Sequence, residues 1–307
     1  VGIADRQTNE AMTIHHVYDL ASVTKLFTTT LILHHVSKKR LTLDDTLASF
    51  QIGPTEIEDI TIRQLLMHNS GLLAWYPFYE QNMRGLAFEE IVQRIPHIRP
   101  YAPGEMVYSD INFMLLRTVC ERIDSRKFEQ QIEFILNEIG DEDGFFGQPS
   151  NEQLVVATEY GNKIEHRMCD DRGFTFQYWR TQSLPIKGEV NDGNCHYYFN
   201  GVSGHAGLFG SKNTLLKLGQ LYLKGGGSLI DAEIVDKVIM DGENGRTLGF
   251  SKEGMFSKGL GHTGFTGTML YMEPSINSIL VLLTNRLHVD TPRDISGIRK
   301  KIIDLIH

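Results

Sequence analysis

The stretch DLASVTKLFTTTLIL, from Asp19 to Leu33, places a serine three residues before a lysine at the start of an apolar segment. The spacing of its apolar residues predicts a helix from Ser22 to about Lys38, with Asp19 as the N-cap. Residues i and i+3 share one helix face, so the Ser22 hydroxyl and the Lys25 ammonium can meet. A serine becomes an effective nucleophile when a base lies beside it. The same spacing is also typical of an ordinary solvated helix start.

The composition excludes several classes of protein. The chain has 307 residues, of which 41% are hydrophobic and 22% charged, enough for a large core in one domain or two closely packed ones. Its formal net charge of -8 argues against a non-specific nucleic-acid binder, which needs basic patches. No apolar run is long enough to span a bilayer. Cys120, Cys169 and Cys195 have no metal-binding spacing and do not make a complete disulfide framework.

Patterns along the rest of the chain predict an α+β fold, with helices concentrated in the middle and strands at both ends. The first residues, VGIADRQT, indicate a strand that runs into a turn. We expect irregular structure over a site at about 144–204. Helices are predicted from Thr61 to Gly71, from about Ser109, and over NTLLKLGQLYL and ISGIRKKIIDLIH; two neighbouring antiparallel strands are predicted over GHTGFTGTMLYMEP and NSILVLLTNR.

A second pattern, VYSDINF, contains Tyr108, Ser109 and Asp110 at the start of a predicted helix. A tyrosine there can transfer protons if a nearby cation lowers its pKa. The alternative is a packed aromatic residue followed by a Ser or Asp N-cap.

A third pattern, GLGHTGFTGT, contains His262, Thr263 and Gly264, where the glycine permits either a close approach of a ligand or a bulge. Taken in order, the three patterns resemble the motifs of serine β-lactamases and penicillin-binding proteins. The chain resembles in particular the branch with Tyr-x-Asn and Lys-Thr-Gly or His-Thr-Gly motifs. That branch contains class C β-lactamases, D-Ala-D-Ala carboxypeptidases and β-lactamase-like esterases. The resemblance extends over nearly the whole chain, through segments such as LTLDDTL, ITIRQLLMHNSGL and GVSGHAGLFGS.

The resemblance implies an antiparallel sheet flanked by helices, plus a mostly helical region, with the site between them. We expect one catalytic domain over 1–307, with its α/β part at about 1–40 and 205–307 and its helical, loop-rich part at about 41–204. In the family a helix and a first strand precede the segment that matches Val1, so the natural protein is expected to be longer. The resemblance also favours a location in the cell envelope.

The mechanism that the resemblance implies is acyl transfer without a metal or cofactor. Ser22 attacks a carbonyl group and becomes acylated, Lys25 and Tyr108 share the removal and relay of its proton, and water releases the acyl group. The backbone N–H groups of Ser22 and Phe265 form the oxyanion hole, which stabilises the negative charge of the transition state.

Two residues depart from the family pattern. Asp110 stands where asparagine is frequent, and an ionised aspartate only accepts hydrogen bonds. It also favours the charged form of Lys25, which leaves Tyr108 more of the proton transfer. His262 replaces the lysine of many β-lactamases and is mostly neutral near pH 7. Both changes favour an esterase or a peptidase over an efficient β-lactamase.

Further candidates come from loops. Arg286 is expected either to bind a substrate carboxylate or to be a solvated residue at a strand end. His205 is expected to be either a pocket residue or a structural hydrogen-bonding group, and His68 to fix a helix end. Asn191 and Asp192 in GEVNDGN are candidates for a pocket loop.

The expected substrate is a small molecule or a peptidoglycan-type compound: a peptidoglycan peptide, a small ester or a D-amino-acid amide. A non-catalytic binder or sensor that uses the same pocket is the alternative, and an inactive truncated chain is a third possibility.

Overall fold

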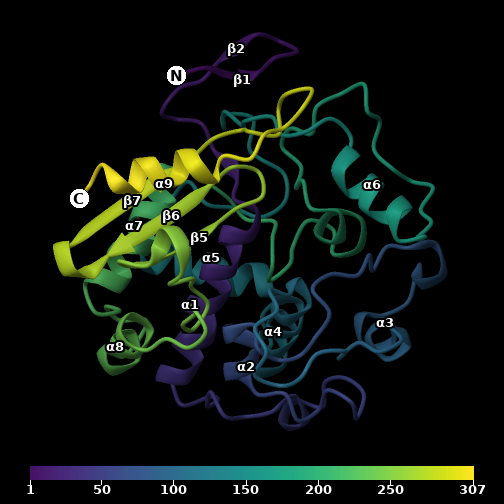
Figure 1. Ribbon diagram of the computed structural model, residues 1–307, viewed down its shortest axis with the longest axis vertical. Helices are drawn as coiled ribbons and strands as arrows, with labels where there is room; N and C mark the ends of the chain where they lie inside the picture. Colours follow the sequence, from purple (N-terminus) through teal and green to yellow (C-terminus); the bar gives the residue numbers. More distant parts are fainter.

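Helix α1 (Thr24–Ser37) forms the centre of the computed structural model, which describes residues 1–307. In Figure 1 it runs between the sheet and the group of helices that contains α2 and α4. The residues from Thr24 to His35 are all buried, so every face of this helix meets other protein atoms. A helix enclosed on all sides needs no polar face, which explains its weak amphipathic pattern. Its burial fixes the position of the residues at its N-terminal end.

The remaining helices cover the sheet or form the mostly helical region. They are α2 (Ile62–Met67), α3 (Phe88–Arg94), α4 (Asp110–Ile123), α5 (Phe128–Glu138), α6 (Lys163–Asp171), α7 (Lys212–Leu223), α8 (Ala232–Met240) and α9 (Ser296–Asp304). Short 3-10 turns occur at Ala21–Val23, Leu47–Phe50, Gln81–Met83, Gly254–Phe256 and Pro274–Ile276, and a π-helical turn at Asn194–Tyr198. None of the helices combines the length and the apolar character required to cross a bilayer.

The main sheet has three antiparallel strands in the order β5-β6-β7: β5 (Leu260–Thr263), β6 (Met269–Glu273) and β7 (Ser278–Leu282). Two short antiparallel pairs accompany it: β1 (Ile3–Asp5) with β2 (Glu10–Ala11), and β3 (Tyr18–Asp19) with β4 (Phe209–Gly210). Helix α7 packs on β6 and β7, and Ile303 of α9 packs with residues of β6 (Figure 1). The segment GHTGFTGTMLYMEP, predicted as one strand, folds into β5, a tight turn and β6.

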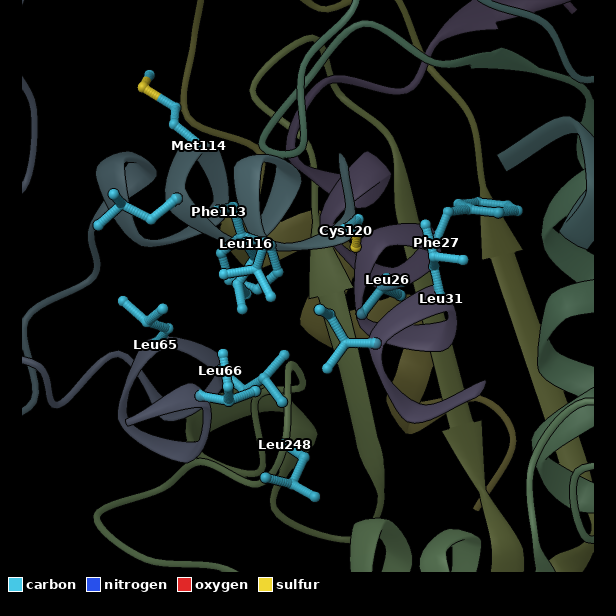
Figure 2. Packing of buried hydrophobic residues seen from close by; sticks show 14 of the residues in the cluster. Leu26, Phe27, Leu31, Leu65, Leu66, Phe113, Met114, Leu116, Cys120 and Leu248 are labelled. Atoms are coloured by element: carbon cyan, nitrogen blue, oxygen red, sulfur yellow. The ribbon is translucent and has the colours of Figure 1, made fainter. Parts of the chain in front are cut away.

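The largest apolar core joins α1 to the helical region. Figure 2 shows side chains of α1 and α4 that point toward one another, with residues of α2 completing the cluster. Its labelled members are all buried: Leu26, Phe27, Leu31, Leu65, Leu66, Phe113, Met114, Leu116, Cys120 and Leu248. Burial of each such side chain contributes about 1.5–3 kcal/mol relative to exposure. The core therefore fixes α1 and the start of α4 against each other.

Two predicted helix ends differ from the structure. Thr61, where the helix was expected to start, is the N-cap of α2: its hydroxyl accepts from Gln64 N at 3.2 Å while the Gln64 side chain accepts from Thr61 N at 2.9 Å. The helix nevertheless ends at His68, which has the left-handed φ of 57°, and not at Gly71. Asp19 lies in β3 and is not the N-cap of α1.

Candidate active site

Ser22 lies in the 3-10 turn that leads into α1, and Asp19 holds this turn in place. The Asp19 carboxylate accepts from Ala21 N at 2.8 Å and from Asn191 N at 2.6 Å. Ala21 has a φ of 48°, a strained value for a residue with a Cβ atom. Such strain persists where surrounding contacts enforce it, and it is frequent beside reactive groups. Asp19, predicted only as a cap, therefore shapes the turn that presents Ser22.

The Lys25 ammonium lies next to the Ser22 hydroxyl, in a fully buried position. Its Nζ donates to Ser22 Oγ at 3.1 Å, to Asp110 Oδ1 at 2.7 Å and to the His205 carbonyl at 3.0 Å. These bonds engage as many acceptors as a lysine has donors. Burial by itself would lower the pKa of Lys25, but the Asp110 carboxylate, with Tyr108, holds that pKa above its usual value. Lys25 is therefore charged at rest, in agreement with the effect predicted for Asp110.

Tyr108 lies just before the N-cap of α4 and close to two cations. The Lys25 Nζ is 5.0 Å from the centre of its ring, and the Arg246 guanidinium carbon is 5.3 Å from it. The rings of His68 and His262 lie 4.5 Å and 5.9 Å from the Tyr108 ring, centre to centre. His68 also accepts from a backbone N–H of the α4 N-cap, so its buried ring fixes both the end of α2 and the place of Tyr108.

A cavity of about 320 Å³ opens over Ser22. The residues that line it come from the 3-10 turn before α1, the segment just before α4, strand β5 and the two segments before and after β5: Ser22, Tyr108, Arg246, Ser251, Phe256, His262, Thr263 and Phe265. Most of the predicted site residues thus meet in one place. Asp110 does not line the cavity, because its carboxylate is paired with Lys25 behind it.

His262 is neutral in this cavity. Burial, and then the charges of Arg246 and Lys25, hold its pKa well below the usual value. Its Nδ1 lies 2.8 Å from the Thr263 carbonyl oxygen, which the neutral ring satisfies by donating from that nitrogen. Its buried Nε2 has no partner within the protein. The β5 histidine therefore supplies hydrogen bonding to the cavity, and no positive charge.

Arg246 is the main site residue that the sequence analysis missed. It is only 8% exposed, yet it lines the cavity, and its Nε and Nη1 have no hydrogen-bond partner in the protein. Burial lowers its pKa, but an arginine keeps its charge under all ordinary conditions. The surrounding segment GENGRTLG gives no sign that the side chain is buried. Arg246 restores the positive charge that the change to His262 removes.

The turn between β5 and β6 brings Phe265 to the edge of the cavity. Gly264 N donates to the Thr268 carbonyl at 2.8 Å, and a Cβ atom at Gly264 would overlap the Thr268 hydroxyl. The Thr266 and Thr268 hydroxyls donate to the carbonyls of Asp19 and Leu20, at 2.8 Å and 2.9 Å. The turn is thus bonded directly to the residues before Ser22. The Phe265 N–H has no acceptor within the protein.

Three candidate pocket residues lie elsewhere. The His205 side chain is buried between Asp192 Oδ1, 2.9 Å from its Nε2, and Ser203 Oγ, 2.8 Å from its Nδ1. Only its carbonyl reaches the site, through Lys25. Arg286 lines a different cavity, and its Nε donates to the Phe265 carbonyl at 2.8 Å. Asn191, expected in a pocket loop, is buried against Asp19.

Comparison with known proteins agrees with this architecture. Residues 1–301 match the family model described as Beta-lactamase. A putative D-alanyl-D-alanine carboxypeptidase of Escherichia coli K12 is 28% identical over 310 residues, which cover 89% of this chain and 69% of that protein. An N-acetylmuramyl-L-alanine amidase of Bacillus subtilis is 28% identical over 311 residues, with 89% and 68% covered.

Solved structures show the same fold at lower identity. The octameric penicillin-binding protein homologue from Pyrococcus abyssi has a TM-score of 0.71 and 20% identity, over 99% of this chain and 69% of that one. A class C beta lactamase from Rhodobacter sphaeroides has a TM-score of 0.69 and 18% identity, over 100% and 90%. The predicted α+β fold of the β-lactamase and transpeptidase type is confirmed.

Proposed function

The chain belongs to the beta-lactamase family, whose members are serine hydrolases, and we propose that it hydrolyses a peptide, amide or ester through an acyl-enzyme on Ser22. We further propose that the leaving group carries a free carboxylate, as in a carboxypeptidase substrate. The observation that carries the proposal is the cavity that brings Ser22, Tyr108 and the unpaired Arg246 together.

Acylation begins with attack of Ser22 Oγ on the carbonyl carbon of the substrate. Because Asp110 keeps Lys25 protonated, the proposed base is the phenolate form of Tyr108, which the nearby charges of Lys25 and Arg246 stabilise, and its oxygen takes the proton of the hydroxyl. The same proton then goes to the leaving nitrogen or oxygen as its bond to the carbonyl carbon breaks. This division of labour gives Lys25 an electrostatic role and Tyr108 the role of general base and acid.

The developing oxyanion is held by the backbone N–H groups of Ser22 and Phe265. The Phe265 N–H is available because it has no acceptor within the protein. Donors of this kind each contribute about 3–4 kcal/mol to transition-state stabilisation. Water then attacks the acyl-enzyme, and its proton returns through Tyr108 to Ser22.

Arg246 is suited to bind the carboxylate of the leaving group. A guanidinium group and a carboxylate form charge-assisted, often bidentate hydrogen bonds, and these are strongest where water is excluded. The two buried, unpartnered nitrogens of Arg246 need such a partner, because an unpaired buried donor costs about 1–3 kcal/mol. A D-alanyl-D-alanine peptide has this carboxylate, whereas a simple ester lacks it.

The first experiment is intact-protein mass spectrometry after treatment with a fluorophosphonate. We expect a single covalent adduct on the wild type and none on Ser22→Ala. The second compares a D-Ala-D-Ala peptide with its C-terminal amide, for the wild type and Arg246→Gln. We expect Arg246→Gln to lower kcat/KM for the free acid by about a hundredfold, and for the amide only a few-fold.

Absence of an adduct on a well-folded wild type overturns the hydrolase proposal. If the D-Ala-D-Ala peptide still binds under those conditions, the charged state of Lys25 becomes the argument for a non-catalytic binding protein. Equal losses for the acid and the amide would remove the carboxylate role of Arg246 alone.

A further inference from the structure

A second cavity, of about 370 Å³, adjoins the one over Ser22. Phe265 lines both cavities, and its side chain is 45% exposed. The walls of the second cavity come from the start of α6 and from the segment after β7 that begins at Arg286. The proposed oxyanion-hole residue therefore stands between two spaces that a substrate can occupy together.

The lining of the second cavity contains three cations, Lys163, Arg167 and Arg286, and two carboxylates, Glu159 and Asp290. Lys163 and Arg167 on α6 are exposed, and Arg286 is partly buried; none of the three forms an ion pair. The neighbouring acids are engaged elsewhere. Glu159 is buried and accepts from the Asn191 side chain at 3.2 Å, and Asp290 lies 3.9 Å from Arg6.

With three cations and two carboxylates, the lining of the second cavity has an excess of one positive charge. The chain carries a net charge of -8, so a random surface patch is more often acidic than basic. A concave site with an excess of one sign of charge raises the local concentration of ligands of the opposite sign. The second cavity thus favours an anionic occupant that reaches it past Phe265.

We propose that the second cavity binds the acyl portion of the substrate and selects an acyl portion that carries a carboxylate. The inference rests on the proposed function: with the leaving group at Arg246, the other side of the scissile bond has to extend away from Ser22 in a different direction. Phe265 marks the border that both cavities share. Arg286 is bonded to the Phe265 carbonyl, so Lys163 and Arg167 are the cations free to select the acyl group.

The test uses p-nitrophenyl esters, in which the leaving group is constant and carries no carboxylate. Half-esters of linear dicarboxylic acids of increasing length, with one free carboxylate, are compared with methyl-capped neutral esters of the same lengths. For the wild type we divide kcat/KM of each anionic ester by that of the neutral ester of the same length. We expect this ratio to rise about tenfold at one chain length of the acyl group. In Lys163→Gln/Arg167→Gln this rise should disappear, so that the ratio is the same at every length.

The matched control is Lys300→Gln/Lys301→Gln, which removes the same charge from exposed positions on α9. This variant should keep the wild-type ratio. Raising the ionic strength should lower the ratio for the wild type, which tests the idea even if the double variant folds poorly.

A ratio that is flat at every length, in a protein whose Ser22 is labelled by the fluorophosphonate, overturns this inference and leaves the proposed hydrolase intact. Failure of the labelling itself contradicts the proposed function instead. A ratio that falls equally in the α9 control would show only a long-range effect of net charge and would also overturn the proposal.

Discussion

The two cavities that meet at Phe265 are built in opposite ways. Apart from the exposed Phe265, the cavity over Ser22 is formed by buried or half-buried groups, and the turns that carry Ser22 and Phe265 are fixed by hydrogen bonds. The second cavity is formed by exposed side chains on the short helix α6 and on an irregular segment. Bond-making steps need groups that are held rigidly before the substrate arrives. Selection of the rest of the substrate can use flexible, screened charges, which change more easily without harming the chemistry.

Lys25→Met is expected to produce the largest loss of reactivity, and this loss should arise in the cavity over Ser22. It removes the buried cation and leaves the Asp110 carboxylate without its partner. We expect the rate of fluorophosphonate labelling to fall about a thousandfold. Loss of one member of a buried ion pair also costs about 3–5 kcal/mol of stability.

A double variant, Lys25→Met/Asp110→Asn, distinguishes these effects. Thermal melting should show that stability is largely recovered because no buried charge is left unpaired, while labelling stays slow. Recovery of labelling in the double variant would contradict an electrostatic role for Lys25.

Gly264→Ala is expected to displace Phe265, the residue that lines both cavities. The added Cβ would overlap the Thr268 hydroxyl and would lie 2.5 Å from the Leu20 carbonyl oxygen. The turn must shift, and the Phe265 N–H moves with it, so we expect acylation to slow about a hundredfold. Gly297→Ala is the control, because a Cβ there meets no atom within 4 Å. Normal labelling rates in Gly264→Ala would argue against an oxyanion hole at Phe265.

Arg286→Gln should produce a smaller loss that affects both cavities. The substitution removes the bond to the Phe265 carbonyl and one cation at the second cavity. We expect a loss of about fivefold in kcat/KM for neutral esters, comparable to one hydrogen bond. Arg293→Gln, at an exposed position nearby, should leave these rates unchanged. A loss confined to anionic esters would mean that Arg286 acts by charge alone.

The smallest expected effect concerns stability and pH on the α6 side. Burial, with the nearby Asp192 charge, raises the pKa of Glu165 to about 8, against an ordinary value of 4.5. Between these values the folded protein binds a proton that the unfolded chain has released, so raising the pH through this window lowers stability. We expect a decrease on the order of 1 kcal/mol between pH 6 and pH 9, measured by urea unfolding.

Glu165→Gln should flatten this decrease. The amide oxygen can still accept from Gly193 N, and the amide nitrogen can donate to the Tyr79 hydroxyl. Glu133→Gln, at an exposed position on α5, should behave as the wild type. An unchanged slope in Glu165→Gln would place the titrating group elsewhere.

The sequence predicted the parts of the site that local spacing controls. Ser22 and Lys25 meet because they are one turn apart, and Tyr108 and His262 each lie at the end of a recognisable helix or strand. Arg246 could not be predicted in this way, because its position in the cavity depends on tertiary burial and not on its neighbours in the sequence.

The same limit applies to the fold. The helix ends at His68, and not at the predicted Gly71, because His68 adopts a left-handed conformation and its ring packs against Tyr108. The hydrogen bond from Lys25 to the His205 carbonyl also could not be predicted, since a backbone carbonyl is present at every residue and gives no signal in the sequence. Apolar enrichment predicted the strand regions well, but it did not show the turn that separates β5 from β6.

The hydroxyls of Thr266 and Thr268 are bonded to the carbonyls of Asp19 and Leu20. They link the C-terminal sheet to the N-terminal segment next to Ser22, the proposed nucleophile. The C-terminal sheet cannot separate from the rest of the protein without displacing the turn that contains Ser22. On heating, the protein should therefore be either folded and active or unfolded and inactive. The temperature at which activity is lost irreversibly should coincide with that of global melting, with no partly active intermediate between them.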